Sequence, residues 1–480
     1  MASVDNAETG LPHLANFSTI KPLRDRLIHR ADRADQYLHA IGSSFFLNDL
    51  SKGSSLSVRR SELYGRSVLL ATYDQLTAAL TMIELDGCAR RITILPLDVE
   101  TNHIGTVMEA AAIDTVVVDR DSPRCAPLDL TARVVCTPSI VSKPQAAIVP
   151  LHTEWVLLTS GTVGAPKMIL HDLASLTAAV AVASPADGAT VWGTFYDIRR
   201  YGGLQIFLRA VLGGASLVLS SVGEPVANHL ARLAKHGVTH ISGTPSHWRR
   251  AMMRPELGAI RPRYVRLSGE IADQAVLDGL RAAFPQAAIG HAYASTEAGV
   301  AFDVYDGQAG FPAAFIGETR DSVEMKVMDG SLFIRSPRTA SRYLGMAQAA
   351  LIDADGFVDT GDIVERRGDR CYFVGRRGGI INVGGLKIHP EEIETVINRH
   401  PQVRMSLVRP KHSPLTGSIV VAEVVLQSEP NCASPQQVEV KNDILMLCRE
   451  VLPRHKVPAA IRFVPTLAVG ATGKLARRQS

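Results

Sequence analysis

A loop of hydroxyl groups, glycines and one lysine follows an apolar run at residues 159–167. The loop reads TSGTVGAPK and comes directly after WVLL. Small residues let a ligand approach the backbone closely, and hydroxyl and N–H groups donate hydrogen bonds to phosphate oxygens. The segment differs from a P-loop of the GxxxxGK[ST] type, since Lys167 follows Pro166 and precedes Met168. It indicates a phosphate site of another kind, with a plain linker as the alternative for this segment alone.

Four further motifs occur downstream in a fixed order. They are GHAYASTEAG at 290–299, GFVDTGD at 356–362, GRRGGIINVGGLKIHPEEIE at 375–394 and GATGKLAR at 470–477. With the loop, the set closely resembles the adenylate-forming superfamily of acyl-CoA synthetases, aryl-acid ligases, peptide-synthetase adenylation domains and firefly luciferase. The resemblance covers roughly residues 65–480. Val163, Met168 and Ala294 depart from the usual TSGTTGxPKG and YGxTE patterns, and none of these changes removes a charged or hydroxyl group.

The resemblance implies that the protein activates a carboxylic acid with ATP. A carboxylate repels nucleophiles, whereas its mixed anhydride with AMP lacks that charge and has a phosphate leaving group. The family releases pyrophosphate and then passes the acyl group to an acceptor. Because the carboxylate and the triphosphate are both anions, the catalytic problem is mainly electrostatic.

The same resemblance assigns the ATP contacts. The loop residues Thr159, Ser160, Gly161, Thr162 and Gly164 would wrap the β- and γ-phosphates, and Lys167 would add positive charge. Thr296 is similar to the hydroxyl donor to the α-phosphate. Glu297 is similar to the ligand of Mg²⁺, a hard cation that takes oxygen ligands.

The nucleoside end of ATP is assigned to three other segments. Tyr293 would lie against the adenine, and the turn Ser268-Gly269-Glu270 would form the other wall of that slot. Asp362 would accept hydrogen bonds from the ribose hydroxyls. Arg376 is similar to the second ribose contact of the family.

The resemblance makes Lys474 the expected catalytic lysine, which bridges the substrate carboxylate and the α-phosphate. The alternative is a solvated lysine near the end of the chain, since Arg477 and Arg478 follow closely. In the family the small domain then swings about a hinge, which falls here at Gly378, with a β-turn glycine as the alternative. Gly385 matches the glycine beside which the pantetheine of CoA passes.

The acid pocket is the least defined part of the sequence. Asp197 stands near the place where many relatives carry a histidine, and it would either bind a substrate amino group or cap the following helix. Arg199 or Arg200 would pair with a second acidic group on the substrate, or would have a structural role. Ala294 is the remaining pocket candidate.

The elements that must position these residues follow an alternating pattern from about residue 65 to 300. Seven short runs read as buried strands: RSVLLATY, RITILP, DTVVVD, WVLLTS, ASLVLS, VTHISG and YVRLSG. Amphipathic segments such as DQLTAALTMIELDG and EPVANHLARLAKHG lie between them and close on glycine. Alternation of this kind predicts an α/β fold of layered, mostly parallel sheets with helices, in which ligands bind at the carboxyl ends of strands.

The pattern changes near residue 371. A helix is expected to begin at PEEIE (390–394), strands at VRMSLVRP (403–410) and GSIVVAEVVLQ (417–427), and a last helix at QQVEVKNDILMLCREVLP (436–453). We therefore expect a large N-terminal domain at 1–376 and a small, mobile α+β domain at 377–480. The first 60 residues are poorly patterned.

Composition excludes several classes of protein. The chain is 46% hydrophobic and 20% charged, with a net charge of +4 that is spread along its length, which does not favour nucleic-acid binding. The start has no apolar signal-peptide core, and no run approaches the roughly 18 apolar residues of a membrane span. Six scattered cysteines without a CxxC motif make a disulfide framework or a structural zinc unlikely and fit a reducing cytoplasm.

Three functions remain open at this point. The first is a cytoplasmic ligase that uses ATP, Mg²⁺ and CoA to convert a small or medium carboxylic acid, aromatic acids included, into its thioester. The second is a stand-alone adenylating enzyme that delivers the acid to a carrier protein, an amine or another nitrogen nucleophile. The third is a catalytically dead adenylate-binding protein, against which Lys474, Glu297, Asp362 and Arg376 argue.

Overall fold

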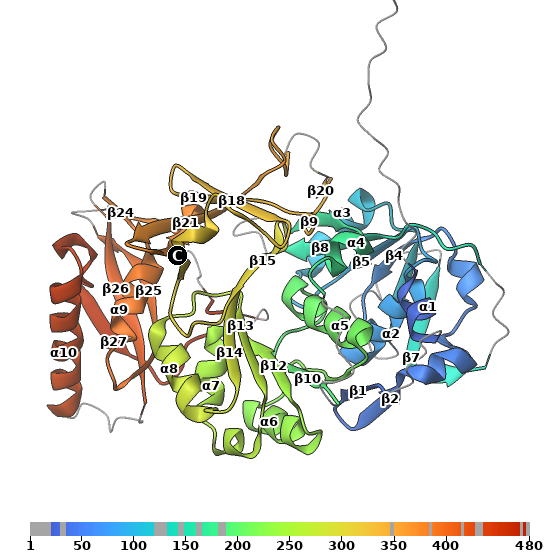
Figure 1. The fold of residues 1–480 in the computed structure, drawn as a ribbon, viewed down its shortest axis with the longest axis horizontal. Coiled ribbons are helices and arrows are strands. Elements are labelled where there is room, and N and C mark those ends of the chain that lie inside the picture. Colours follow the sequence, from blue (N-terminus) through green and yellow to red (C-terminus); the bar gives the residue numbers. More distant parts are fainter. Residues whose placement is uncertain are drawn as a thin grey trace, which may run out of the picture.

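The protein is described here from a computed structural model. It describes residues 21–28, 35–119, 132–142, 148–159, 166–180, 189–345, 350–383, 386–413, 417–427, 435–470 and 474–476. Within these residues the chain forms three large sheets, followed by a smaller group of strands and helices near the C-terminus (Figure 1).

The first large sheet has the order β15-β14-β13-β12-β10-β11-β1-β2. Its strands are Gly299–Val304, Ala288–Ser295, Tyr264–Ser268, His240–Gly243, Val191–Thr194, Ser216–Val218, Tyr37–Ala40 and Ser43–Phe46, in that order. The strands from β14 to β1 pair in parallel, and only the two outermost pairs are antiparallel. The loops that follow β13 and β14 carry the Ser268-Gly269-Glu270 and Thr296-Glu297 segments.

The second large sheet has the order β20-β9-β8-β5-β4-β6-β7-β3. Its strands are Arg342–Leu344, Lys167–His171, Glu154–Thr159, Arg91–Ile94, Ser67–Leu70, Thr115–Val118, Arg133–Val141 and Ser54–Leu56. The strands from β8 to β7 are parallel. β8 and β9 are antiparallel neighbours, with Thr159 opposite Lys167, so the predicted phosphate loop connects two paired strands.

The seven predicted strands are all present in these two sheets, and the expectation of a layered, mostly parallel α/β fold is confirmed. The helices are α1 Leu23–Ile28, α2 Gln75–Leu85, α3 Thr101–Ala110, α4 Leu173–Thr177, α5 Tyr201–Gly213, α6 Val226–Lys235, α7 Pro245–Ala251 and α8 Gln274–Ala283.

The amphipathic expectation for the segment at residues 74–87 is wrong. Every residue of α2 is buried, because the helix contacts β3 and β7 of the second sheet on one side and β1 of the first sheet on another. A helix held between two sheets has no face left for water. Its start is fixed by Asp74, whose carboxylate accepts from the N–H groups of Leu76 and Thr77.

The third large sheet is antiparallel in its described pairs, with the order β16-β22-β21-β19-β18-β17. Its strands are Phe311–Pro312, Arg370–Arg376, Val358–Arg367, Ser331–Arg335, Val323–Met328 and Thr319–Arg320. Asp362 on β21 and Arg376 at the end of β22 are cross-strand partners. This sheet therefore brings the two predicted ribose residues together.

A short 3-10 turn, Arg377–Gly379, follows β22, and the C-terminal elements come after it. They are β23 Ile381–Val383, β24 Leu386–Ile388, α9 Pro390–Ile397, β25 Val403–Ser413, β26 Gly417–Leu426, α10 Pro435–Val451 and β27 Ala460–Phe463. They bury a core of their own, which includes Ile393, Ala422, Val424 and Ile444. In Figure 1 this group occupies one end of the molecule.

The first 60 residues contain more regular structure than their weak pattern suggests. β1 pairs in parallel with β11, and β3 pairs with β7, so both strands belong to the large sheets. Such pairings join segments far apart along the chain, which periodicity within a short window does not reveal.

Candidate active site

A cavity of about 1800 Å³ lies between the large sheets and the C-terminal elements. Most of the described candidate residues line it: Thr159, Lys167, Asp197, Arg200, Ser268, Gly269, Glu270, Tyr293, Ala294, Thr296, Glu297, Asp362, Arg376, Gly378 and Lys474. Arg199 does not line it. Ser160, Gly161, Thr162, Gly164 and Gly385 lie outside the described residues.

The described ends of the phosphate loop meet at one side of the cavity. Thr159 ends β8 and Lys167 begins β9, and the two face each other across the strand pair. The Lys167 ammonium lies 5.4 Å from the centroid of the Tyr343 ring, a cation–π distance. Tyr343 also lines the cavity, and the sequence analysis did not select it because it lies on β20, far along the chain.

The turn that carries Thr296 and Glu297 is held by backbone contacts. His171, at the end of β9, donates from Nε2 to the Thr296 carbonyl at 2.7 Å, and the Glu297 carbonyl accepts from the Ala340 N–H at 2.9 Å. Burial lowers the pKa of His171 to about 4, so its imidazole is neutral at physiological pH. His171 therefore links the β8–β9 pair to the turn, a role that sequence reasoning missed.

Asp362 is the acceptor at the centre of the ribose group. Its Oδ1 accepts from Arg376 Nε at 2.8 Å, and its Oδ2 accepts from the Tyr293 hydroxyl. The Tyr293 ring stacks on Phe373 with centroids 4.8 Å apart and planes 13° from parallel. Phe373, which the sequence analysis did not select, lines the same cavity three residues before Arg376.

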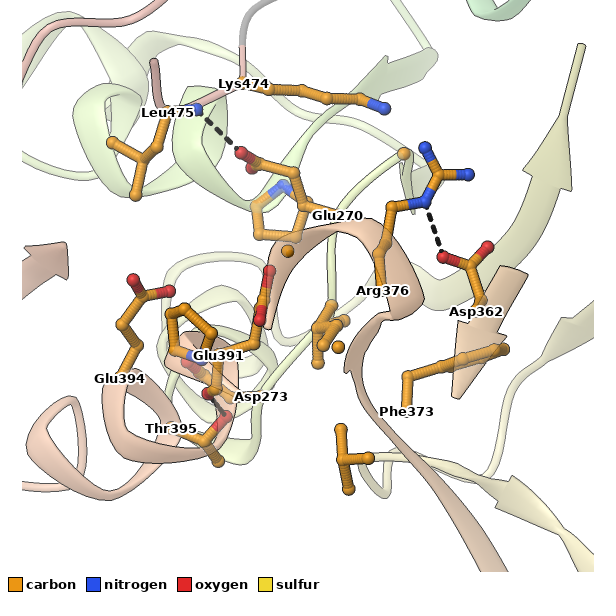
Figure 2. A pocket seen from close by; sticks show the side chains of 18 of the residues that line it. Glu270, Asp273, Asp362, Phe373, Arg376, Glu391, Glu394, Thr395, Lys474 and Leu475 are labelled. Carbon is orange, nitrogen blue, oxygen red and sulfur yellow. Dashed lines mark hydrogen bonds and ion pairs between the residues drawn. The ribbon is translucent and has the colours of Figure 1, made fainter. Parts of the chain in front are cut away.

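Lys474 reaches this cavity from the last described segment of the chain. A Cβ placed on Gly269 would lie 3.4 Å from Lys474 Cε, so the lysine stem runs across the backbone of the Ser268-Gly269-Glu270 turn. Gly269 also has a φ of +87°, which favours glycine. Figure 2 shows the Lys474 side chain extending toward the part of the cavity where Arg376 and Asp362 lie.

Glu270 joins the Lys474 segment to the large sheets. Its Oε1 accepts from the Leu475 N–H at 3.0 Å (Figure 2). Oε1 also accepts from Ser246 Oγ at 3.0 Å, and Oε2 accepts from the Ser246 N–H at 2.9 Å. Ser246 lies in the first turn of α7. The carboxylate thus bridges the start of a helix and the residue next to Lys474.

The Lys474 ammonium lies near a second cation, Arg376. Loss of hydration lowers its pKa most, and the positive charge of Arg376 lowers it further, whereas Glu270, Asp362 and Glu297 act in the opposite direction. Lys474 and Arg376 are cations on the wall of a cavity that carboxylates also line. Two neighbouring cations suit an anionic group that binds between them.

Asp197 and Arg199 form a closed pair. The Arg199 guanidinium donates to both carboxylate oxygens of Asp197, at 2.8 and 2.7 Å, and also to the carbonyls of Thr72 and Tyr73. Arg199 is fully buried, so the expectation that it faces the substrate has no support in the geometry. Asp197 does not cap α5 either, since the N-cap residue is Arg200, without a side-chain cap.

Arg200, the second arginine candidate for the acid pocket, lines the cavity. Its NH1 donates to the Leu158 carbonyl at 2.7 Å, and its NH2 pairs with Asp98. The guanidinium therefore lies beside the end of β8, next to Thr159. This places its charge near the predicted phosphate loop.

Two family models match the chain. The model of the AMP-binding enzyme matches residues 75–344, and that of the AMP-binding enzyme C-terminal domain matches residues 392–474. The chain belongs to the AMP-binding enzyme family. The described catalytic candidates from Lys167 to Glu297 lie within the first match, and Lys474 is the last residue of the second.

Curated relatives and solved structures are similar to this AMP-binding enzyme. The 4-coumarate–CoA ligase 2 of Oryza sativa subsp. japonica is 26% identical over 371 residues, which cover 70% of this chain and 63% of the relative. The chain thus spans less than two thirds of that relative's length.

Two solved structures share the fold at low identity. The anthranilate CoA ligase AuaEII, in complex with anthranoyl-AMP, has a TM-score of 0.78 at 17% identity, with 95% of each chain covered. The amide bond synthetase McbA from Marinactinospora thermotolerans has a TM-score of 0.74 at 18% identity, with 94% of this chain and 97% of the other covered.

Proposed function

We propose that this AMP-binding enzyme joins a small carboxylic acid to AMP with release of pyrophosphate, and then transfers the acyl group to the thiol of CoA. The observation that carries the proposal is the position of Lys474. It lies across Gly269 and shares the cavity with Arg376, Asp362 and Glu297. A cation there stabilises the negative charge that gathers when the acid oxygen approaches the α-phosphorus.

The assignment of the ATP contacts rests on the same cavity. Thr159, Lys167 and Arg200 meet at the end of β8, which suits the β- and γ-phosphates. Asp362 and Arg376 are cross-strand partners and suit the two ribose hydroxyls, and Thr296 lines the same cavity. Tyr293, with Phe373 stacked on it, supplies a wall for the adenine.

Magnesium is the metal that fits this proposal. Among the described residues no group of three or more His, Cys, Asp or Glu side chains is arranged to hold a metal. That agrees with Mg²⁺, which proteins bind through one or two carboxylates together with substrate phosphates and water. Glu297 would hold it and orient the phosphates, and the ion would neutralise charge on the leaving pyrophosphate.

The acceptor is proposed as CoA, with a carrier protein, an amine or another nitrogen nucleophile as the alternative. The curated relative is a CoA ligase, and one structural neighbour is an amide bond synthetase, so the shared fold serves more than one acceptor. The NVGGLKIHPEEIE segment favours CoA by its resemblance to acyl-CoA synthetases. Gly385, the proposed neighbour of pantetheine, lies outside the described residues.

The proposal includes two domains that meet at the cavity, with the boundary after residue 376 and the hinge at Gly378. Support comes from β22, which ends at Arg376 in the third sheet, and from the separate core of the following elements. We also place the enzyme in the cytoplasm. No described helix is long and apolar enough to span a membrane, and the four described cysteines are buried thiols.

The part of the cavity around Asp197 and Ala294 suits a carboxylic acid whose remaining part is uncharged, aromatic acids included, better than an amino acid. Both oxygens of Asp197 are occupied by Arg199, so this carboxylate has no free charge for a substrate ammonium. Ala294, which has a small side chain, lines the same cavity, and Gly203 packs against the Asp197 backbone. A panel of benzoic and cinnamic acids, together with short aliphatic acids, is therefore the first to test.

The deciding experiment is pyrophosphate release with this acid panel, with and without CoA. The parental enzyme should release pyrophosphate with at least one acid and form a thioester when CoA is present. Lys474→Ala should slow adenylation by about 10²–10³, as expected for loss of one charge-stabilising donor. A variant that forms adenylate at the parental rate contradicts the role of Lys474. Consumption of the adenylate by an amine and by no thiol would replace CoA with the alternative acceptor.

A further inference from the structure

A second cavity, of about 310 Å³, lies beside the C-terminal end of α7 and the start of α6. Its lining combines three arginines with the start of α6: Pro225, Val226, Ala227, Arg250, Met253, Arg254, Arg404 and Thr466. Arg250 and Arg254 come from the end of α7 and the residues after it, whereas Arg404 lies on β25. The cavity therefore lies between the large sheets and the C-terminal elements.

The three arginines have no acidic partner among the described residues. Within the part of the chain that the structure describes, the guanidiniums of Arg250, Arg254 and Arg404 make no ion pair or side-chain hydrogen bond, and the Arg404 Nε is buried without an acceptor. Neighbouring arginines differ: Arg249 pairs with Asp273, and Arg232 pairs with Glu224. Asp273 and Glu224 are thus committed to other arginines, whereas Glu256, two residues after Arg254, has a buried Oε2 and no ion pair among the described residues.

Partial burial makes this arrangement of three like charges electrostatically unfavourable. Arg250 and Arg404 are half-buried, and loss of hydration lowers the pKa of each, followed by the charge of the neighbouring arginines. Arginine remains charged under these conditions, so the repulsion stays in the folded protein. An anion between the guanidiniums would convert that repulsion into attraction.

The start of α6 adds a second, independent preference for an anion. Pro225 is its N-cap and provides no side-chain cap, so the first N–H groups of this ten-residue helix lack a side-chain acceptor. Val226 and Ala227 of that first turn line the cavity. The positive end of a helix and guanidinium forks together match the geometry of phosphate oxygens.

We infer that this cavity binds a phosphate-class dianion, held by Arg250, Arg254 and Arg404 at the start of α6. The source is either free phosphate or pyrophosphate, or the phosphate of a nucleotide. This site is separate from the ATP cavity, since the residues that line the one do not line the other.

Binding at this site would stabilise the domain arrangement seen here. Arg250 and Arg254 lie in the large part and Arg404 in the C-terminal part, and beside the cavity Arg249 NH1 donates across this contact to the Arg404 carbonyl at 3.4 Å. A ligand that bridges both parts favours the arrangement in which they meet. If the proposed function holds, phosphate should therefore favour adenylation over the step that requires domain rotation.

The test measures binding directly and needs no carboxylic acid. Isothermal titration of the full chain with inorganic phosphate, pyrophosphate and adenosine 3′,5′-bisphosphate is made at constant ionic strength, with AMP present to fill the nucleotide site. Arg250→Gln, Arg254→Gln and Arg404→Gln are compared with Arg462→Gln. Arg462 is an exposed arginine on β27 of the same C-terminal sheet, so its removal changes the charge equally without touching the cavity.

We expect the parental enzyme and Arg462→Gln to bind at least one of these ligands with the same Kd. Each cavity variant should bind about tenfold more weakly or worse, the usual effect of losing a hydrogen bond to a charged group. The ligand that binds most tightly identifies the source. Equal weakening in Arg462→Gln would show a general charge effect and overturn the site. Binding of an acidic peptide alone, without any phosphate ligand, would overturn it as well.

Thermal unfolding keeps the inference testable if a variant folds differently. In phosphate-free buffer, Arg404→Gln should have a Tm equal to or above the parental Tm, because it removes a half-buried cation that has no acidic partner among the described residues. Phosphate should raise the Tm of the parental enzyme and of Arg462→Gln but not of Arg404→Gln. A lower Tm for Arg404→Gln without phosphate, with no difference in the response to phosphate, would mean that Arg404 is merely structural.

Discussion

At the residue scale, the candidate site combines charged side chains that contact one another around the cavity. Asp362 holds Arg376 and the Tyr293 hydroxyl, and Lys474 lies beside Arg376 without an ion pair to a carboxylate among the described residues. The motifs selected these residues correctly as cavity residues. They could not show that Arg199 is consumed by Asp197, because that depends on the carbonyls of Thr72 and Tyr73.

Replacing Asp362 with alanine should weaken ATP binding and leave acid preference unchanged. The carboxylate faces the proposed ribose side of the cavity, whereas the acid side is lined by Asp197 and Ala294. Loss of hydrogen bonds to a charged acceptor should raise the Kd of ATP by about tenfold or more. The measurement is KM for ATP with several acids. A changed order of acids with unaltered ATP affinity would contradict the ribose assignment.

The pH dependence of adenylation should reveal the lowered pKa of Lys474. The protonated ammonium is the active form, so kcat/KM is retained below its pKa and lost as the pH rises through it. Because burial and Arg376 lower that pKa, the alkaline decline should begin below the ordinary range of lysine, near 10.4. Lys474→Arg should move the decline to higher pH, since guanidinium stays protonated. An unmoved decline in this variant would assign the titration to another group.

At the scale of elements, the site depends on contacts between segments that are distant in sequence. Seven strands of the two mostly parallel sheets could be predicted because each is a short, buried apolar run, whereas the pattern does not single out β10 or β14. The third sheet could not, since strands such as Phe311–Pro312 and Thr319–Arg320 are too short for a periodic pattern. The burial of α2 and the His171–Thr296 contact depend equally on tertiary neighbours.

Glu270 should act on catalysis by positioning the segment that carries Lys474. Its Oε1 accepts from the Leu475 N–H, so Glu270→Ala should lower the rate of adenylation by about tenfold, as expected for a charged hydrogen bond. Glu270→Gln keeps an acceptor oxygen and should lose less. The readouts are pyrophosphate release and, separately, thioester formation from a synthetic acyl-adenylate. The second step should not depend on the Glu270–Leu475 contact, because the proposed domain rotation breaks that contact before the step occurs.

Ser246→Ala is the matched control for this contact. It removes the hydroxyl that donates to the same Oε1 but leaves the Leu475 N–H and Lys474 in place. It should therefore keep most of the adenylation rate. An equal loss of both half-reactions in Glu270→Ala, with a lowered Tm, would mean that Glu270 serves only the stability of α7.

At the scale of the whole molecule, the structure shows one arrangement of the large sheets and the C-terminal elements. The described polar contacts between these parts include Leu475 with Glu270, Arg404 with Arg249, and Asn398 Nδ2, which donates to Asp273 Oδ2 at 3.3 Å. All of them involve polar groups that water could satisfy after separation, and such interfaces permit relative motion. The mobile small domain expected from the sequence is compatible with this interface, and its motion remains a prediction.

Gly378→Val should separate the two half-reactions. Gly378 lies in the turn after β22, its φ is outside the left-handed range, and no atom lies within 4 Å of a Cβ placed there. A valine therefore fits the arrangement that holds Lys474 in the cavity, and adenylation should stay near the parental rate. Valine excludes the backbone angles that only glycine reaches readily, so a rotation that uses them would be slowed, and thioester formation should fall by about tenfold or more.

Gly379→Val is the matched control, because Gly379 belongs to the same turn and also has open space around it. If Gly378 is the hinge, the Gly379 variant should carry out both half-reactions at similar rates to the parental enzyme. Rapid-quench measurement of adenylate and thioester in single turnovers distinguishes the two steps. Loss of the second step in Gly379→Val alone would move the hinge by one residue. If both variants carry out both steps at the parental rates, neither position needs a backbone angle that only glycine reaches readily. Gly378 would then be an ordinary turn residue.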